Sequence, residues 1–313
     1  MSIKTSITYK LTAVLFIFSM LIACDNAESQ SNVEGSVADN FPLLSSTPIA
    51  YARFAKLPKD VLIRSGNISV KKQELDAEIE EARSNMRKQL QDNAFFILEQ
   101  KFTEKVILEE SKRALTNKGT DISSMQDMQI IQAFIMGMIE EVEPTEKEMA
   151  DFYEANKDMM GGMPLERVKG QILAFLQQQK QQETVQDYVK NVLTGRQVEI
   201  SAPWASEYIP KALNNAVDKA RASSKPTLAN FGSDGCVPCQ MMIPAREAVI
   251  EKLGDKVNVV YIHVDKDQIL ASRYGVQSIP TLIFFDKQGN EIHNHVGMMS
   301  QEEMEERLNN LLK

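Results

Sequence analysis

The chain has 313 residues, which is too long for one comfortable core and favours two domains. With 43% hydrophobic and 25% charged residues, its composition is that of a globular protein. The formal net charge is −8 at pH 7. So acidic a surface repels a phosphate backbone, and nucleic acid is therefore not expected as a partner.

Residues 1–23 have the features of an export signal. Lys4 and Lys10 supply a basic start, and residues 11–23 form an uncharged apolar run. The run is too short for a membrane-spanning helix, which needs about 20 residues, and it fits the apolar part of a signal peptide.

The apolar run ends in Leu21-Ile22-Ala23-Cys24, which resembles the lipobox of bacterial lipoproteins. That resemblance implies cleavage before Cys24, a lipid on the Cys24 sulfur and anchoring on the periplasmic side of a membrane. Asp25 favours the inner membrane in that family. Residues 24–60 are then expected to be a lipidated tether. The alternative is an ordinary secretory signal in which Cys24 has no role.

The other two of the three cysteines, Cys236 and Cys239, are separated by two residues. If Cys24 carries a lipid, they can pair only with each other or with a substrate. A disulfide between them closes too small a loop to stabilise the fold much, so we expect their role to be chemical.

Residues 61–200 are predicted to form an all-α domain. A short hairpin over 61–68 precedes apolar residues at three- and four-residue spacing, which predict one long helix over 72–115. Further predicted elements are helices over 124–141, 144–156 and 165–193 and a short closing strand over 197–200.

This order of elements, with the run Leu165–Ile172, resembles the N-terminal domain of SurA-type periplasmic chaperones and related peptidyl-prolyl isomerases. The isomerase domain expected next in that family is replaced by a different segment, so no prolyl isomerase activity is expected. The resemblance implies binding of unfolded exported proteins, or self-association into a homo-oligomer. The loop Met159-Met160-Gly161-Gly162-Met163 cannot easily bury three methionines, which favours a partner or client contact there. An amphipathic dimer seam along the glutamine-rich helix over 165–193 is equally compatible.

Residues 201–224 are predicted to be a linker with a short helix, and Trp204 is expected to pack between the two domains. From 225 to 313 strands and helices alternate, which indicates an α/β domain. The predicted strands are 226–231, 257–265, 281–285 and 291–296, and the predicted helices are 240–253, 269–274 and 300–312.

Four features of this last segment occur in a characteristic order. Cys236-Val237-Pro238-Cys239 follows a strand, and Pro244 lies five residues after the second cysteine. Ile279-Pro280-Thr281 opens a later strand, and Gly297 follows the last one. Together they resemble the thioredoxin family, which implies a thioredoxin fold over 225–313.

The resemblance also implies a redox-active dithiol. Cys236 stands at a helix N-terminus that favours a thiolate, so it is expected to be the attacking nucleophile, and Cys239 resolves the mixed disulfide. Pro280 is expected to be cis and to place neighbouring backbone beside the sulfurs, where an extended substrate pairs. The expected substrate-binding residues are Val237, Pro238 and Ile279. No cofactor is expected.

A zinc site is the alternative interpretation of the cysteines. Cys236 and Cys239 with two of the histidines would have the right ligand count. Those histidines are His263, His293 and His295. The last two lie far along the chain from the dithiol, and the prolines of the motif have no purpose in a zinc site, so no metal is expected.

The segment departs from the thioredoxin pattern at three positions. The buried aspartate that accepts a proton from the resolving thiol is replaced by Asn230, and its lysine partner by Tyr261. Asparagine cannot act as a base, so slower resolution is expected. Gly235 stands where an aromatic residue is usual, and the charge of Asp234 beside it should oppose thiolate formation in part.

The dipeptide Val237-Pro238 and the Ile279 before the cis-proline resemble membrane-anchored reducing members of the family. The first hypothesis is a membrane-tethered periplasmic oxidoreductase that reduces or isomerises disulfides in exported proteins. It would draw electrons from an unidentified thiol–disulfide donor. The second is a chaperone or assembly factor for unfolded exported proteins in which the dithiol is secondary, and an inert scaffold is the third.

Overall fold

The computed structural model describes residues 34–157 and 161–313. The predicted export signal with Cys24 and Asp25 lies outside these residues, as do Met159 and Met160 of the methionine loop. Within the described residues, hydrophobic cores form separately in an N-terminal and a C-terminal region.

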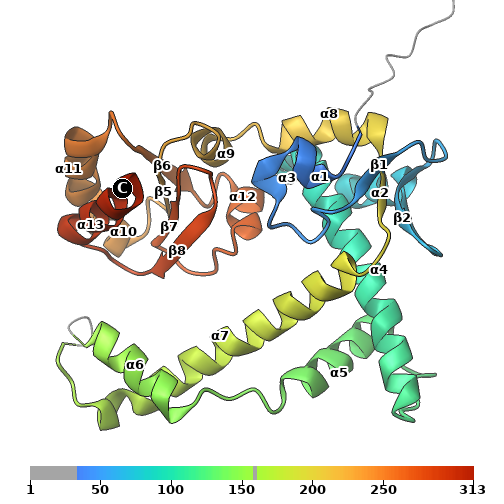
Figure 1. The fold of residues 1–313 in the computed structure, drawn as a ribbon, viewed down its shortest axis with the longest axis horizontal. Coiled ribbons are helices and arrows are strands. Elements are labelled where there is room, and N and C mark those ends of the chain that lie inside the picture. The colour runs from blue at the N-terminus through green and yellow to red at the C-terminus, as the bar shows by residue number, and fades with distance from the viewer. Residues whose placement is uncertain (1–33, 158–160) are drawn as a thin grey trace, which may run out of the picture. The chain divides into compact units, whose positions relative to one another are not determined.

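The N-terminal region combines helices with a small sheet. Its helices are α1 (Val37–Asn40), the 3-10 turn η1 (Pro42–Leu44), α2 (Lys72–Glu81), α3 (Ser84–Asp92), α4 (Ala94–Asn117), α5 (Asp127–Ile139), α6 (Glu146–Asn156), α7 (Leu165–Thr194) and α8 (Ala202–Ala212) (Figure 1). Its strands are β1 (Arg53–Ala55), β2 (Val61–Ser65), β3 (Ile68–Lys71) and β4 (Glu199–Ser201).

These four strands form one sheet in the order β1-β4-β2-β3, with β1 parallel to β4 and the other pairs antiparallel. The predicted hairpin and closing strand are therefore both present, and Ile63 of the hairpin pairs with Ile200 of the closing strand. The expectation of an all-α domain is wrong. Hydrophobic patterning did not reveal that these short strands meet, because their pairing joins segments more than a hundred residues apart.

The tether predicted over 24–60 does not extend that far. Val37, Leu44 and Ile49 are buried in the N-terminal core, and the Ser36 and Asp39 side chains cap α1 reciprocally. Burial of these apolar side chains favours the packed form of the segment. Residues 36–55 thus belong to the folded domain.

The single helix predicted over 72–115 is divided into α2, α3 and α4. Ala82 is extended, with φ −67° and ψ 155°, and it ends α2. At the second break, Asn93 Nδ2 donates to the Gln89 carbonyl at 2.8 Å and competes with the regular helix bonds. The spacing of apolar residues predicts the buried face, but it does not show where the helix axis bends.

Helix α7 has 30 residues, and it packs against α6 through a small core of Met149, Tyr153, Val168 and Ile172. None of the helices in the described part of the chain has both the length and the apolar character required to cross a membrane.

The C-terminal region is an α/β domain. Its strands are β5 (Thr227–Gly232), β6 (Asn258–His263), β7 (Thr281–Phe285) and β8 (Glu291–Val296), in the order β6-β5-β7-β8. Its helices are α9 (Ala216–Arg221), α10 (Val237–Met241), α11 (Ile243–Leu253), α12 (Gln268–Arg273) and α13 (Gln301–Leu312). Strand β5 is parallel to β6 and antiparallel to β7, which in turn is antiparallel to β8.

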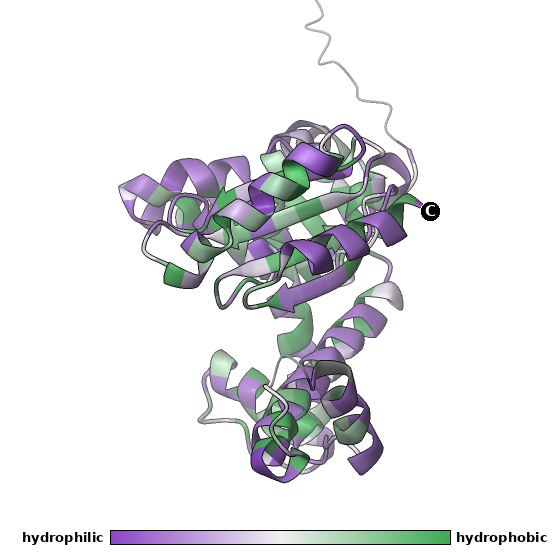
Figure 2. Ribbon diagram, turned by 90° about the vertical axis from the view of Figure 1, so that its left-hand side faces the viewer, coloured by the Kyte–Doolittle hydropathy of each residue, from purple (hydrophilic) through white to green (hydrophobic). Residues whose placement is uncertain are grey.

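Two hydrophobic clusters cover the two faces of this sheet. Helices α11 and α13 pack Val249, Leu253 and Leu308 against one face, and α9 and α12 pack Val217 and Leu270 against the other. The central strands β5 and β7 are buried along their whole length, whereas the edge strand β8 is largely exposed. Figure 2 shows hydrophobic ribbon in the middle of the sheet and hydrophilic ribbon on the helices around it. As the capping-box spacing predicts, Ser300 caps α13 together with Glu303.

The linker predicted over 201–224 is instead two helices, α8 and α9, that belong to different cores. Trp204 of α8 is buried in the N-terminal core and stacks on Tyr208 with ring centroids 4.7 Å apart. The expectation that Trp204 packs between the domains is therefore wrong. Val217 of α9 is part of the C-terminal core, so that domain begins before residue 225.

A buried carboxylate ties α9 to α12. Asp218 is 1% exposed, and it accepts two hydrogen bonds from Arg273, at 2.5 and 3.0 Å, and one each from Arg221 and Tyr274 at 3.0 and 2.7 Å. Burial by itself raises the pKa of Asp218. The charge and hydrogen bonds of Arg273, together with the hydrogen bonds from Asn215 and Tyr274, outweigh this effect, so the pKa is lowered overall.

We predict that Asp218→Asn lowers the unfolding free energy of the C-terminal domain by about 3–5 kcal/mol at pH 7, because the arginines stay buried without their counter-charge. Since the folded-state pKa is lowered, this stabilisation exists above the unfolded pKa of about 3.9 and is lost as the pH falls through the folded value. Urea unfolding monitored by hydrogen exchange of the β5–β8 amides at pH 7 and in acid measures both effects.

The matched control for Asp218→Asn is Asp255→Asn, which changes an exposed aspartate of the same domain. Equal stability of the two variants at pH 7 would contradict the role assigned to Asp218.

Candidate functional site

The paired cysteines lie where the chain leaves the end of β5. That strand is buried along its whole length, and the chain leaves the sheet through Ser233 and turns into α10. Cys236 is the N-cap of α10 and Cys239 lies one turn further on. The two form a disulfide with Cα atoms 5.2 Å apart.

The helix predicted over 240–253 begins earlier and is broken. Pro238 stands in the first turn of α10 and Pro244 in the first turn of α11, positions where the missing N–H of proline costs no helix bond. Pro244 therefore starts a second helix and does not lie inside one.

The two sulfurs differ in access. Cys239 is 4% exposed, whereas Cys236 is half-buried next to Val237, which is 70% exposed. The backbone N–H of Cys239 donates to the Cys236 sulfur at 3.2 Å. This donor and the helix N-terminus favour negative charge on Cys236, so the arrangement suits Cys236 as attacking thiolate and Cys239 as resolving thiol.

Pro280 lies at the same end of the sheet as the dithiol. The Ile279–Pro280 peptide bond is cis, as the resemblance implies. Thr281, the next residue, pairs with Phe231 of β5, so the proline is brought toward the turn that carries Cys236. The Pro280 carbonyl accepts from the Gly297 N–H at 2.8 Å, and Gly297 has φ +115°, a conformation that side chains disfavour. The fold thus brings the cis-proline and the dithiol, which are far apart in the sequence, to the same end of the sheet.

Behind Cys239, the position of the usual buried aspartate is held by a buried asparagine with a cationic neighbour. Asn230 Oδ1 accepts from Arg246 Nη1 at 3.0 Å. Arg246 in turn lies over the ring of Tyr261, 4.5 Å from its centroid, and Tyr261 is the register partner of Asn230 on β6. Sequence reasoning identified Asn230 and Tyr261 but missed Arg246. Its position seven residues after Cys239, two helical turns along, was the available signal.

A histidine side chain lies next to the carboxylate of Asp234. His263 Nε2 lies 3.1 Å from an Asp234 oxygen, and its Nδ1 lies 3.8 Å from Asp265. When His263 is protonated it compensates the carboxylate that was expected to oppose thiolate formation.

The histidines of the zinc interpretation lie on two strands, with His263 on β6 and the other two on β8. His293 and His295 lie on β8, which is separated from β5 by β7. Among residues 34–157 and 161–313, no three His, Cys, Asp or Glu side chains converge as metal ligands would.

Comparison with known proteins gives the same result for the C-terminal domain. Residues 213–312 match the family model described as "Thioredoxin-like domain". The thioredoxin of Bacillus subtilis is 39% identical over 90 residues, which are 29% of this chain and 86% of that protein. Through this domain the chain belongs to the thioredoxin family.

Two further relatives match the same part of the chain. A thioredoxin-like protein of Synechocystis is 36% identical over 100 residues, which are 32% of this chain and 94% of that protein. The chloroplastic thioredoxin Y of rice is 37% identical over 91 residues, and the match spans 29% of this chain but only 54% of that relative. These relatives support a thiol–disulfide oxidoreductase kind of activity, and the match from residue 213 places α9 in the domain.

We predict that iodoacetamide modifies Cys236 of the reduced protein at least about tenfold faster than Cys239 at pH 7, because Cys239 is buried and Cys236 is accessible and stabilised as thiolate. Mass spectrometry of the two alkylated sulfurs after short exposure measures the ratio. Equal modification of both, or faster modification of Cys239, would contradict the assignment of attacking and resolving thiols.

Proposed function

We propose that this chain is a membrane-tethered thiol–disulfide oxidoreductase that reduces or isomerises disulfides in exported proteins on the periplasmic side. The observation that carries the proposal is the asymmetric pair: an accessible Cys236 sulfur receiving a backbone N–H, beside a buried Cys239. A structural disulfide has no use for that asymmetry.

In the proposed reaction the Cys236 thiolate attacks one sulfur of the client disulfide. A Cys236–client disulfide forms, the client S–S bond breaks, and the released client thiolate takes a proton from solvent. Cys239 then attacks Cys236 and frees the second client thiol. The client gains two electrons, the dithiol loses two, and an unidentified thiol–disulfide donor restores the reduced pair.

Client binding is assigned to the apolar rim of the site. Val237 is exposed, Pro238 and Ile279 are half-buried, and Pro280 precedes β7, which begins beside the dithiol turn. Side chains of this kind suit an extended client segment that pairs with backbone next to the cis-proline.

The reducing direction rests on the resemblance of Val237-Pro238 and Ile279 to reducing members of the family. The tether rests on the lipobox-like sequence ending in Cys24, with Asp25 favouring the inner membrane. An anchored enzyme would act on exported proteins close to the membrane, where a membrane-bound electron donor is accessible.

A trapping experiment tests the reaction and its clients. Cys239→Ala is expected to hold clients as mixed disulfides through Cys236, because the resolving thiol is gone, and Cys236→Ser is the matched control that forms none. Non-reducing gels and mass spectrometry of the adducts identify the clients. A Cys239→Ala protein that captures no more than Cys236→Ser would refute the proposal.

The midpoint potential tests the direction separately. We predict a value between about −270 and −180 mV, the range of thioredoxin and protein disulfide isomerase, measured in glutathione redox buffers. A potential near −120 mV, that of a strong oxidant, would leave an oxidoreductase but reverse its direction.

A second candidate function, a chaperone or assembly factor for unfolded exported proteins, is favoured by the apolar surface of the N-terminal region. Helix α5 is mostly apolar, yet only Ile130 and Ile131 of it are buried, while Met128 and Met136 are 62% and 58% exposed. Exposed methionines of this kind adapt to clients of varied shape. The same surface suits self-association into a homo-oligomer.

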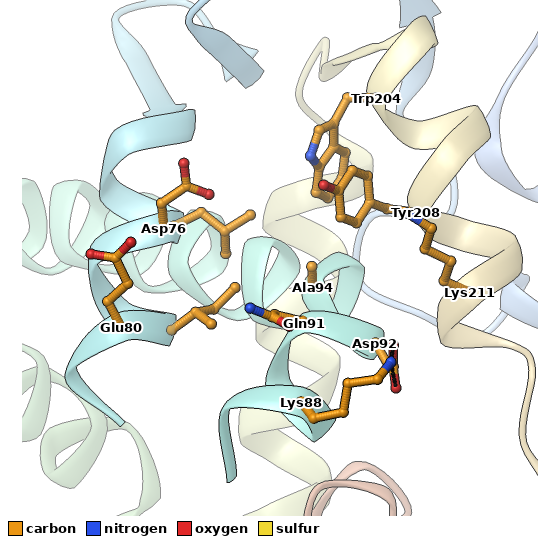
Figure 3. A pocket seen from close by; sticks show the side chains of 11 residues that line it. Asp76, Glu80, Lys88, Gln91, Asp92, Ala94, Trp204, Tyr208 and Lys211 are labelled. Carbon is orange, nitrogen blue, oxygen red and sulfur yellow. Dashed lines mark hydrogen bonds and ion pairs between the residues drawn. The ribbon is translucent and has the colours of Figure 1, made fainter. Parts of the chain in front are cut away.

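The N-terminal region also has a pocket of about 380 Å³ between α2, α3 and α8. The stacked Trp204 and Tyr208 form one wall, and Asp76 and Glu80 face them from α2 (Figure 3). Such a pocket would receive an aromatic or basic side chain of a client.

The chaperone candidate predicts that Met128→Gln with Met136→Gln lowers suppression of aggregation at least about twofold, since less apolar surface remains for clients. Insulin reduction by the dithiol should be unchanged. Ile250→Gln, which alters an exposed apolar residue of α11, is the matched control. If both variants suppress aggregation as the unchanged chain does, this surface does not bind clients.

A further inference from the structure

The resolving thiol has no carboxylate base in the position where one is usual. Asn230 is 3% exposed, its Oδ1 is occupied by Arg246, and its Nδ2 has no hydrogen-bond partner. An amide neither accepts a proton at neutral pH nor carries charge. The buried face behind Cys239 therefore presents donors and a cation, where a proton acceptor would be expected.

Tyr261, which is 37% exposed, and Arg246, which is half-buried, form a pair at the edge of this face. The guanidinium lies 4.5 Å from the centre of the ring, within the range of a cation–π contact, and the bond to Asn230 fixes its orientation. Arginine keeps its charge at every pH at which the protein folds. The pair therefore supplies a fixed positive charge beside a phenol.

The phenol reaches Cys239 across Gly232. A Cβ on Gly232 would lie 2.9 Å from the Tyr261 hydroxyl oxygen and 3.2 Å from the Cys239 sulfur. Both atoms therefore lie close to the same point above the Gly232 backbone, and a larger residue there would press on both of them. The absence of a side chain at this position keeps the hydroxyl and the sulfur neighbours.

The hydroxyl remains protonated near neutral pH. Burial raises the pKa of Tyr261, Arg246 lowers it, and the charges of Asp234 and Asp265 raise it again, with a net increase. His263 lies against both of these aspartates. A phenol in this state donates a hydrogen bond and does not remove a proton from a thiol.

We infer that Tyr261 and Arg246 replace the missing carboxylate by a different mechanism, in which they stabilise the Cys239 thiolate and do not take up its proton. In the reduced protein the Tyr261 hydroxyl donates to the Cys239 sulfur, and Arg246 is the positioning residue that holds the ring and adds positive charge. This inference rests on the proposed oxidoreductase function and concerns its second step.

In that step the Cys239 proton passes to solvent and the thiolate attacks the Cys236 sulfur. The Cys236–Cys239 bond forms, and the bond between Cys236 and the client sulfur breaks. The electron pair leaves with the client thiolate, which takes a proton from solvent. Tyr261 keeps its proton throughout.

The chromogenic disulfide dithiobis(nitrobenzoate) separates the two steps in single-turnover measurements on the full chain with Cys24→Ser. Attack by Cys236 releases one thionitrobenzoate, and resolution by Cys239 releases a second. The first phase tests the proposed function, because an unreactive Cys236 gives no release. The pH dependence of the second phase tests the inference.

For Tyr261→Phe we expect the midpoint of the second-phase profile to rise by about one pH unit, the effect of losing one hydrogen bond to a charged group. A thiolate of higher pKa is also more nucleophilic, so the rate at pH 7 should fall only about three- to fourfold and the alkaline plateau should rise. The two profiles then cross. General loosening of the fold would not produce a crossing, and the first phase should change little.

Two further changes test the contacts individually. Gly232→Ala places a methyl 2.9 Å from the hydroxyl oxygen and 3.2 Å from the sulfur, so the contact between them has to open. It should shift the midpoint in the same direction, and it should add nothing to Tyr261→Phe in the double variant. Arg246→Gln should raise the midpoint, and Arg246→Lys should restore part of the shift through its charge. The matched control is Tyr153→Phe, a tyrosine with Lys157 at 5.6 Å from its ring centroid in the other domain.

A Tyr261→Phe profile that superimposes on that of the unchanged site, or whose midpoint falls, overturns the inference while the first phase still supports the proposed function. Full additivity of Gly232→Ala and Tyr261→Phe also overturns it. A shift in Tyr153→Phe as large as that in Tyr261→Phe would show that the effect is not local and would overturn the inference.

Discussion

The close approach of the Cys239 sulfur to the bare backbone of Gly232 is the constraint on which the site depends. It requires a residue without a side chain at the end of β5, and it brings the Tyr261 hydroxyl of the neighbouring strand within reach of the same sulfur. Cys239 is thereby buried, while Cys236, at the start of α10, stays accessible. The division of labour between the two thiols follows from this one contact at the strand end.

The rest of the C-terminal domain holds that strand end in place. Strand β5 is central and buried, and helices on both faces fix it through separate apolar clusters. The cis-proline is also held by a segment distant in sequence, because the Gly297 N–H donates a hydrogen bond to the Pro280 carbonyl near the turn that carries Cys236. Asp218, with its two arginines, adds a charged tie between α9 and α12 on the face away from Arg246. Rigid support of this kind suits a site whose chemistry requires fixed distances between two sulfurs.

The N-terminal region is less uniformly buried than the C-terminal domain. Its main core is well packed around Phe95, Phe102 and Ile200, but α5 leaves methionines exposed, and α6 and α7 share only a small core. Less burial per residue permits easier local opening, which a surface for varied clients would use. In the proposed function, the N-terminal surface would hold an unfolded client while the C-terminal domain exchanges its disulfides.

The sequence by itself determined the strands and most helices of the C-terminal domain, the redox pair and the four features that mark the thioredoxin family, because strand periodicity, turn residues and a CxPC segment are local signals. It also identified Asn230 and Tyr261 as departures. It missed the break between α10 and α11 and the place of α9 in this domain. Only the tertiary structure decided that residues 36–55 are folded, that the N-terminal strands form one sheet and that 72–115 is three helices. It alone placed Arg246 against Asn230 and Tyr261, since a contact between a helix and two strands depends on how the whole domain packs, which no stretch of sequence encodes locally.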